Sequence, residues 1–257
     1  MSKDLINGYV TVETHNGITT IEFFHPQSNS LPHRLLDELA NEIHDAGHDK
    51  DTRVIVLRSA GEKAFCAGAS FDELAAIETE ARGFEFFSGF ANVINAMRKC
   101  PKFIIARVHG KCVGGGVGLA AAADYAIAFE AAEIKLSELA VGIGPFVVGP
   151  AIQRKLGLSS FSQLAIDASM WRNGDWARRK GLYSELHTTI EGMDESIHRL
   201  ATKLAHSNPE AMTEMKKIFW EGTANWDDLL AQRAEISGRL VTSQFTKEAI
   251  SQFKAKK

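Results

Sequence analysis

The sequence predicts an α/β fold followed by a helical C-terminal region, and three observations support this prediction. The β-branched run at residues 103–108 leads into four glycines within residues 114–118 and then into an alanine-rich helical stretch. Over the first two thirds of the chain, strand-like runs alternate with amphipathic helical segments. The last third contains mostly helical patterns, with apolar residues at helical spacing from residue 196 onward.

The N-terminal elements are predicted to be a β-hairpin, a helix and a buried strand. Residues 9–13 and 18–24 are rich in β-branched and aromatic side chains, and His15-Asn16-Gly17 between them is typical of a hairpin turn. A helix that ends near His48 is then predicted by apolar residues at helical spacing, which are Leu31, Leu35, Leu36, Leu39 and Ile43. The continuous apolar run at 53–58 predicts a strand covered on both faces.

Two turns of small residues each follow a strand-like run and precede a helical segment. One lies within residues 63–74, and the other is the glycine turn at 114–118. Backbone N–H groups at a helix N-terminus are unpaired and lie at the positive end of the helix dipole, and glycine lets a ligand approach the main chain. The glycine turn can therefore hold an oxyanion or a phosphate. If both turns direct N–H groups at one oxygen, they form an oxyanion hole.

Two other interpretations of the glycine turn stay open at this point. The glycines can serve only to let the helix pack closely against the sheet. Residues 116–121 also match the dinucleotide-binding fingerprint G-x-G-x-x-A. The next strand-like run begins at Tyr125, however, and the helix of about two turns that remains is too short for a parallel crossover. Dinucleotide binding is therefore disfavoured.

Glu138 is the candidate acid/base residue. It lies beside the apolar, glycine-rich loop at residues 139–145. Loss of hydration in such surroundings would raise the pKa of its carboxyl group, as proton transfer near neutral pH requires. The alternative is a solvated surface glutamate, which the two nearby turns disfavour. Asp124, in contrast, is expected to be structural, as a cap or a hydrogen-bond acceptor.

The last third of the chain is predicted to be mostly helical. Short helices are expected at 149–156, 160–168 and 175–181. Beyond residue 196, the helical pattern is interrupted at Asn208-Pro209 and resumes, with further helices at 227–240 and 245–253. A helical tail of this length has apolar faces that must pack on the core or on another subunit.

The composition excludes several classes of protein. Hydrophobic residues make up 45% and charged residues 24% of the 257 residues, which is ordinary for a globular protein, and the net charge of −3 provides no basic footprint for nucleic acid. No signal-like or membrane-spanning apolar run is present, so no membrane association is expected. The three cysteines lack metal-binding spacing, which predicts reduced thiols, no structural metal and a cytoplasmic location.

The order and spacing of several motifs resemble those of the crotonase, or enoyl-CoA hydratase/isomerase, superfamily. The resemblance covers nearly the whole chain, and it rests on Asn29-Ser30-Leu31, Ala64-Phe65-Cys66-Ala67-Gly68-Ala69, His109-Gly110 with Gly114-Gly115-Gly116, Ala123-Asp124, Ser137-Glu138 and Gly181-Leu182. It implies a crotonase-like core of stacked ββα units that form two nearly perpendicular sheets, at residues 1–195. Residues 196–257 would be a C-terminal helical trimerisation region, in a homotrimer or a dimer of trimers.

The resemblance also implies a substrate and a set of site residues. The substrate would be an acyl-CoA thioester, with coenzyme A entering as part of the substrate, and with no permanently bound cofactor and no metal. By matched position, the N–H groups of Ala69 and Gly115 would bind the thioester oxygen, and Glu138 would be the acid/base. The expected substrate-binding residues are Ala67, Gly68, Gly114, Gly142, Pro145, Phe146, Phe253 and Lys254. Among these, Ala67 would lie near the adenine end of CoA.

Two departures from the family pattern bear on the reaction. Hydratases of the family carry a first glutamate just after the glycine turn, where this chain has Gly118. Its absence favours a proton shift by a single carboxylate, although Gly-Gly-Gly-Val-Gly-Leu is also similar to methylglutaconyl-CoA hydratases. The second departure is the loop at 145–150, where Phe146 predicts a more apolar acyl pocket than in related hydratases.

The leading hypothesis is an enoyl-CoA hydratase/isomerase, with hydration favoured because it is the commonest reaction of the family. The first alternative is a 3-enoyl to 2-enoyl isomerase that uses Glu138 alone. The second is a non-catalytic acyl-CoA-binding protein. The missing glutamate favours this alternative, and the retained Glu138 disfavours it. RNA binding is disfavoured by the net charge.

Overall fold

The computed structural model describes residues 4–255 of the chain, with side chains as far as Gln252. Its strands are β1 (Tyr9–His15), β2 (Ile18–Phe24), β3 (Val54–Ser59), β4 (Ala64–Cys66), β5 (Phe103–Val108), β6 (Lys111–Val113), β7 (Tyr125–Phe129), β8 (Ile134–Lys135) and β9 (Glu185–His187). The helices are α1 (His33–His48), α2 (Phe71–Ala75), α3 (Glu80–Lys99), α4 (Gly115–Ala122), the 3₁₀ helix η1 (Glu138–Val141), α5 (Gly149–Ile166), α6 (Gly174–Arg179), α7 (Ile190–Ala205), α8 (Pro209–Phe219), α9 (Trp226–Val241) and α10 (Gln244–Ala255).

The larger sheet has six strands in the order β1-β2-β3-β5-β7-β9. The hairpin β1–β2 is antiparallel, as predicted, and its turn residues Asn16 and Gly17 both have positive φ, as a type I′ turn requires. The other pairs in this sheet are parallel. Helices cover both faces, which explains why the run at 54–57 is buried throughout.

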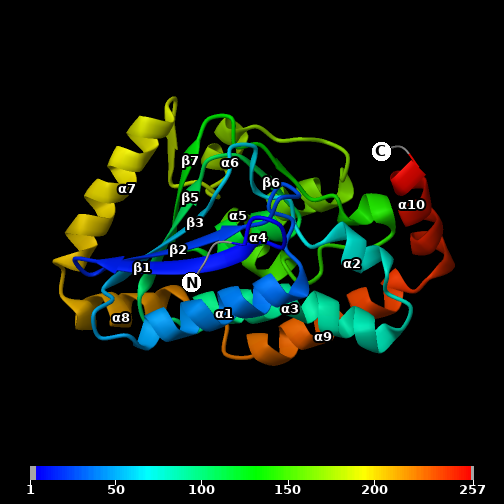
Figure 1. Cartoon of the computed structure of the whole chain (residues 1–257), viewed down its shortest axis with the longest axis horizontal. Helices are drawn as coiled ribbons and strands as arrows, with labels where there is room; N and C mark the ends of the chain where they lie inside the picture. Colours follow the sequence, from blue (N-terminus) through cyan, green and yellow to red (C-terminus); the bar gives the residue numbers. More distant parts are fainter. Residues whose placement is uncertain (1–3, 256–257) are drawn as a thin grey trace.

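Different helices cover the two faces of this sheet. The main core contains apolar side chains of α1 and α3, among them Leu36 and Ile94, which pack against Ile55 and Leu57 of β3. The other face carries α7, whose Met193, Ile197 and Ala201 pack on the alternate residues of the parallel strands. Figure 1 shows α7 on one side of the sheet and the layer of α1, α3 and α9 on the other.

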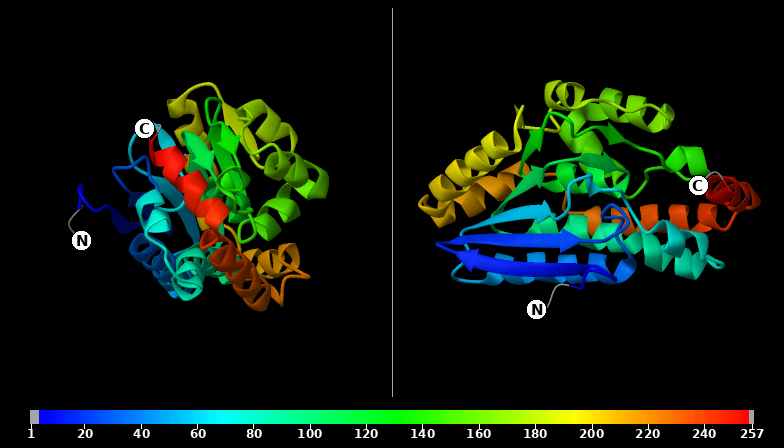
Figure 2. Two further views of the ribbon diagram at one scale, coloured as in Figure 1. Left: turned by 90° about the vertical axis from the view of Figure 1, so that its right-hand side faces the viewer. Right: turned by 45° about the horizontal axis from the view of Figure 1, so that its top comes forward.

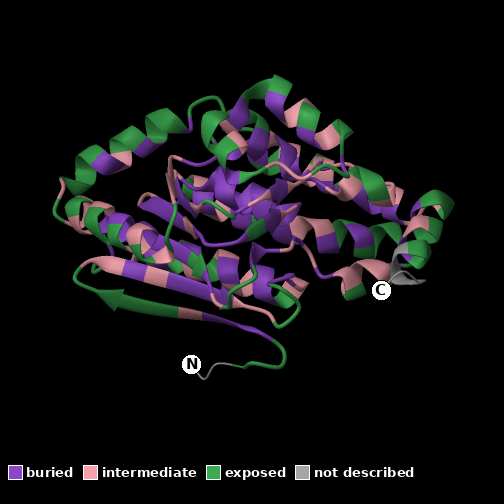
Figure 3. Ribbon diagram, turned by 90° about the horizontal axis from the view of Figure 1, so that it is seen from above, coloured by how far each residue is buried: buried purple, intermediate pink, exposed green. Residues whose placement is uncertain are grey.

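A second, smaller sheet positions the two turns. It consists of three parallel strands in the order β4-β6-β8. Helix α4 begins directly after β6, and all eight of its residues are buried. The buried residues gather in the middle of the molecule (Figure 3), so the glycine turn lies at the end of a helix that is enclosed by protein.

The structure departs from the sequence prediction in the shortest elements. Strands β4, β6, β8 and β9 have two or three residues each and were not predicted. The helices expected at 149–156 and 160–168 form one element, α5, which is interrupted at Gly157 with φ 77°. The domain boundary expected at residue 195 falls inside α7.

The C-terminal helices extend along one side of the molecule to α10, which lies at one end (Figure 2). There α10 contacts η1 through a hydrogen bond from Thr246 Oγ1 to the carbonyl oxygen of Gly142, at 3.2 Å. Among the helices of residues 4–255, none has the length and apolar composition needed to cross a membrane.

Candidate active site

The two small-residue turns meet at the same edge of the smaller sheet. Strand β4 ends at Cys66 and β6 ends at Val113, and because the strands are parallel their carboxyl ends lie together. Gly68 has φ 91°, and a Cβ there would lie 3.1 Å from the carbonyl oxygen of Val113 and 3.6 Å from the nitrogen of Gly115. The turns are thus in contact, and glycine at position 68 allows both the positive φ and the close approach.

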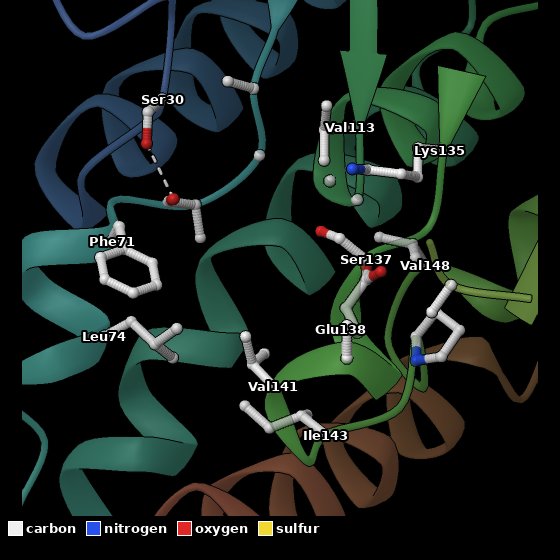
Figure 4. A pocket seen from close by; sticks show the side chains of 18 of the residues that line it. Ser30, Phe71, Leu74, Val113, Lys135, Ser137, Glu138, Val141, Ile143 and Val148 are labelled. Carbon is white, nitrogen blue, oxygen red and sulfur yellow. Dashed lines mark hydrogen bonds between the residues drawn. The ribbon is translucent and has the colours of Figure 1, made fainter. Parts of the chain in front are cut away.

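Each turn presents an unpaired backbone N–H group. Within the described part of the chain, neither the N–H of Ala69 nor that of Gly115 donates a hydrogen bond to another residue. The carbonyl of Ala69 is held by Ser30 Oγ at 2.8 Å (Figure 4), which fixes this turn. Gly115 is the first residue of α4, where N–H groups have no partner in the helix. A Cβ at Gly115 would lie 2.1 Å from Phe90 Cζ, so a side chain there requires the Phe90 ring to move.

Glu138 lies next to the glycine turn. A Cβ on Gly114 would lie 3.0 Å from Glu138 Oε1, so the carboxyl group borders the backbone of that turn. Its Oε2 atom is buried and has no hydrogen-bond partner among the described residues. Burial raises the pKa of Glu138 to about 7, with backbone hydrogen bonds at Glu138 and Ser137 opposing the shift. The group therefore exchanges a proton near neutral pH.

One cavity of about 910 Å³ joins these groups. Among the residues predicted from the sequence it is lined by Ala67, Gly68, Ala69, Gly114, Gly115, Glu138, Pro145 and Phe146. Its other walls are largely apolar and include Leu74, Phe86, Phe87, Phe90, Val141 and Ile143. Figure 4 shows Glu138 between Ser137 and Val141, with Phe71 and Leu74 across the cavity. A cavity of this size and character can enclose a small organic ligand.

Gly142 is the described substrate-binding residue of the prediction that the structure does not place in the cavity wall. Gly142 instead packs against α10, since a Cβ there would lie 2.5 Å from Thr246 Oγ1. The side chains of Phe253 and Lys254 lie outside the described residues. Gly142 therefore connects the loop after Glu138 with the C-terminal helix.

Beside Gly118 of α4, where the first glutamate is missing, the space is occupied by Val148, which lies outside this helix. A Cβ on Gly118 would lie 2.6 Å from Val148 Cγ1 and 2.9 Å from Val148 Cβ. Val148 itself lines the cavity, in the loop where the sequence departs from related hydratases. A side chain at position 118 thus requires Val148 to move, and the two departures from the family pattern are in contact.

The other chemically active side chains near the turns, His109, Cys66 and Cys112, are buried outside the cavity. His109 is buried with neither ring nitrogen hydrogen-bonded to a described residue, and burial lowers its pKa to about 4. Burial raises the pKa of Cys66 to about 12 and that of Cys112 further. None of the three lines the cavity. Residues 4–255 also contain no cluster of three or more His, Cys, Asp or Glu side chains suited to a metal ion.

Lys135, Ser137 and Trp171 line the cavity and were not predicted as site residues. Lys135 belongs to the two-residue strand β8, and its approach to the cavity depends on the pairing of β8 with β6. Trp171 comes from the loop between α5 and α6. The sequence contains no local signal for either placement, because both depend on contacts between distant segments.

Comparisons with known proteins match this fold along nearly its full length. The family model described as enoyl-CoA hydratase/isomerase matches residues 13–257. A probable enoyl-CoA hydratase of Bacillus subtilis (strain 168) is 26% identical over 242 residues, which are 93% of each chain. The crystal structure of an enoyl-CoA hydratase from Bacillus halodurans has a TM-score of 0.87 at 21% identity and covers 95% of this chain and 99% of that chain.

A further relative has a different activity. The (7aS)-7a-methyl-1,5-dioxo-2,3,5,6,7,7a-hexahydro-1H-indene-carboxyl-CoA hydrolase of Rhodococcus jostii (strain RHA1) is 34% identical over 132 residues. This match spans 51% of each protein, so it relates only about half of the two chains.

The two-sheet α/β core with its helical C-terminal region is the crotonase fold. The chain belongs to the enoyl-CoA hydratase/isomerase family, because the family model matches almost all of it. The expected fold class and superfamily are therefore confirmed, and the chain is an enzyme of the hydratase or isomerase type. The likeness to methylglutaconyl-CoA hydratases stays a prediction.

Proposed function

We propose that this enzyme converts an unsaturated acyl-CoA thioester through an enolate, with Ala69 and Gly115 as the oxyanion hole and Glu138 as the acid/base. One observation carries the proposal: the Glu138 carboxyl group, whose buried Oε2 atom has no hydrogen-bond partner among the described residues, shares one cavity with two backbone N–H groups that donate to no described residue. Coenzyme A would enter as part of the substrate, so the reaction needs no permanently bound cofactor.

The geometry suits the steps of this chemistry. The thioester oxygen would accept hydrogen bonds from both N–H groups, and these bonds strengthen as negative charge develops on the oxygen. Glu138, whose pKa is about 7, would then remove or deliver the proton at the carbon next to the carbonyl. The apolar walls exclude water from the enolate and strengthen both hydrogen bonds.

The contact between Gly118 and Val148 favours isomerisation as the reaction. Addition of water across the double bond benefits from one group that holds the water and another that delivers the proton. The side chain that would carry a second carboxyl group at position 118 would meet Val148 at its Cβ. A single carboxylate suffices for a 1,3-proton shift, because it takes the proton from one carbon and returns it to another. Hydration would require Glu138 to perform both roles.

Turnover of a panel of enoyl-CoA thioesters tests this proposal. The panel contains matched 2-enoyl and 3-enoyl chains, with linear, branched and carboxylated members. We expect 3-enoyl thioesters to be converted to 2-enoyl thioesters: the proton is removed from C2 and a proton is returned at C4, so deuterium taken up from D₂O during the conversion appears at C4. Conversion of 2-enoyl to 3-hydroxyacyl thioesters would assign hydration instead. Tight binding without any turnover or deuterium exchange would contradict the proposal and leave a non-catalytic acyl-CoA-binding protein as the better account.

The expected trimer, or dimer of trimers, is part of the same proposal. Large apolar side chains are exposed on α5 and α8, with Ile166 exposed to 74%, Leu158 to 63% and Ile218 to 60%. Such surfaces are typical of subunit contacts. Light scattering is expected to give three or six times the mass of one chain, and a monomer at micromolar concentration would contradict this part of the proposal.

A further inference from the structure

A single cationic side chain, Lys135, lines the described part of the cavity. The other acidic or basic side chains of the lining are Asp72 and Glu138. Most of the wall is apolar, and a positive charge beside such a wall attracts an anion more strongly than it would in bulk water. Figure 4 shows Lys135 on the side of the cavity that carries Val113 and Ser137, away from Phe71.

The backbone around Lys135 fixes its place. Lys135 pairs with Val113 in the parallel ladder between β8 and β6, and its carbonyl accepts the N–H of Gly114 at 2.9 Å. Two backbone hydrogen bonds between Ile134 and Arg172, at 2.8 and 2.9 Å, hold the loop of Trp171 against β8. The Lys135 ammonium lies 4.6 Å from the centre of the Trp171 ring. This cation–π contact orients the side chain but does not neutralise its charge.

Lys111 provides an internal comparison for Lys135. It lies two residues before Val113 on β6, and its ammonium is also 4.6 Å from the centre of the Trp171 ring. Lys111 is exposed and forms an ion pair with Glu133 at 3.3 Å. Lys135 forms no ion pair with any described residue, Glu138 included. The charge of Lys135 is therefore available to a ligand in the cavity.

We propose that Lys135, held on the Trp171 ring, binds an anionic group of the thioester substrate. The anion is a carboxylate on the acyl chain or a phosphate of coenzyme A, which present the same oxygen chemistry to an ammonium group. Lys135 is thus a specificity-determining residue. This inference rests on the proposed function, because it assumes that an acyl-CoA thioester occupies the cavity.

Binding of saturated thioesters tests the inference separately from catalysis. Saturated chains can be neither hydrated nor isomerised, so titration calorimetry measures only affinity. The probes are butyryl-CoA, glutaryl-CoA, and the butyryl and glutaryl thioesters of pantetheine, which lack phosphate. The variants are Lys135→Met, which removes the charged group and keeps an unbranched side chain, and Lys135→Arg, which keeps the charge. The matched control is Lys111→Met. Lys111 contacts the same Trp171 ring but does not line the cavity.

For Lys135→Met we expect the Kd of the recognised thioesters to rise about tenfold or more, as for a lost charge-assisted hydrogen bond. If only the two glutaryl thioesters bind more weakly, the anion is an acyl carboxylate. If only the two CoA thioesters bind more weakly, the anion is a CoA phosphate. Lys135→Arg is expected to retain most of the affinity, and Lys111→Met all of it. Circular dichroism of each variant confirms that it is folded.

Several outcomes would overturn the inference. The first is an affinity of Lys135→Met within about twofold of the wild type for all four probes, a change well below the tenfold factor of a lost ionic hydrogen bond. The second is a loss of affinity in Lys111→Met that equals the loss in Lys135→Met. If the wild type binds none of the probes, the proposed function fails together with this inference. If Lys135→Met weakens binding as expected but no enoyl thioester is turned over, the proposed reaction fails while the role of Lys135 stands.

Discussion

Replacing Glu138 with glutamine is expected to lower kcat by about 10²- to 10⁴-fold, the usual contribution of a positioned acid/base. Glutamine has nearly the same shape but neither takes nor delivers a proton at neutral pH. The affinity for the thioester should change little, because the proposed oxyanion hole consists of the backbone of Ala69 and Gly115. Initial rates with the enoyl-CoA that the wild type converts fastest, together with the Kd of its saturated analogue, measure the two effects separately.

The pH dependence tests the same role through the raised pKa of Glu138. If Glu138 first acts as a base, kcat/KM rises with pH and reaches half its plateau near pH 7. If it first acts as an acid, the rate falls through the same range. This limb should disappear in Glu138→Gln and persist in the control Glu130→Gln, which changes an exposed glutamate. A Glu138→Gln enzyme that keeps the wild-type rate and profile would contradict the assignment.

The raised pKa also has a consequence for stability. A carboxyl group whose pKa rises from 4.5 in its ordinary state to about 7 in the folded protein favours folding when it is protonated. Its contribution is therefore fully present below pH 4.5 and is lost as the pH rises through about 7. The enzyme accepts this loss at neutral pH because an ionised Glu138 is the form that removes a proton.

The sequence predicted the elements that are defined by local pattern. The β-hairpin at Asn16-Gly17 needs only its turn residues and its alternating side chains. Helix α1 follows from the spacing of its apolar residues, of which Leu35, Leu39 and Ile43 are fully buried. The interruption of α5 also lies where a break between two helices was expected, because Gly157 adopts a positive φ.

The sequence could not predict elements that exist only through distant partners. Strand β8 contains just Ile134 and Lys135, and it is a strand because it pairs with β6 and, through Ile134, with Arg172. A run of two residues has no periodicity to detect. The three-residue strand β9 is likewise defined by its pairing with β7.

The candidate site likewise has a part that local sequence patterns predicted and a part that depends on contacts between distant residues. Ala69, Gly115 and Glu138 follow turn and loop signals in the sequence, and the structure brings them to one cavity. The loss of the first glutamate was also visible at Gly118. That Val148 fills its place could not be predicted, because the two residues are 30 positions apart and meet only through tertiary packing.

The side chain of Asp124 connects helix α8 to the core. Its Oδ2 atom lies 2.8 Å from Lys216 Nζ of α8 and also accepts the N–H of Ile104 at 2.8 Å. Its Oδ1 atom accepts Trp220 Nε1–H at 3.2 Å, and Lys216 donates further to the carbonyl of Lys102 at 2.7 Å. The expectation that Asp124 is a structural acceptor is confirmed by these bonds. They connect α8 to the start of β5 and to the end of α4.

Replacing Lys216 with methionine is expected to lower the free energy of unfolding by about 3–5 kcal/mol, as when one partner of a buried ion pair is removed. The side chains of Lys216 and Asp124 are exposed to only 3% and 8%, so water does not replace the lost partner. The carboxylate of Asp124 would then remain buried with two neutral donors. Urea unfolding at one fixed protein concentration measures the change, because subunit association would otherwise shift the midpoint.

Lys217→Met is the matched control for this prediction. Lys217 lies next to Lys216 on α8, but its side chain is 66% exposed and its ion pair with Glu214 lies at the surface. Removing a surface pair of this kind changes stability by about 0–1 kcal/mol. The double variant Asp124→Asn/Lys216→Met should lose less than the sum of its single changes, because no unpaired charge stays buried. Equal destabilisation by Lys216→Met and Lys217→Met would show that the buried pair does not hold α8 to the core.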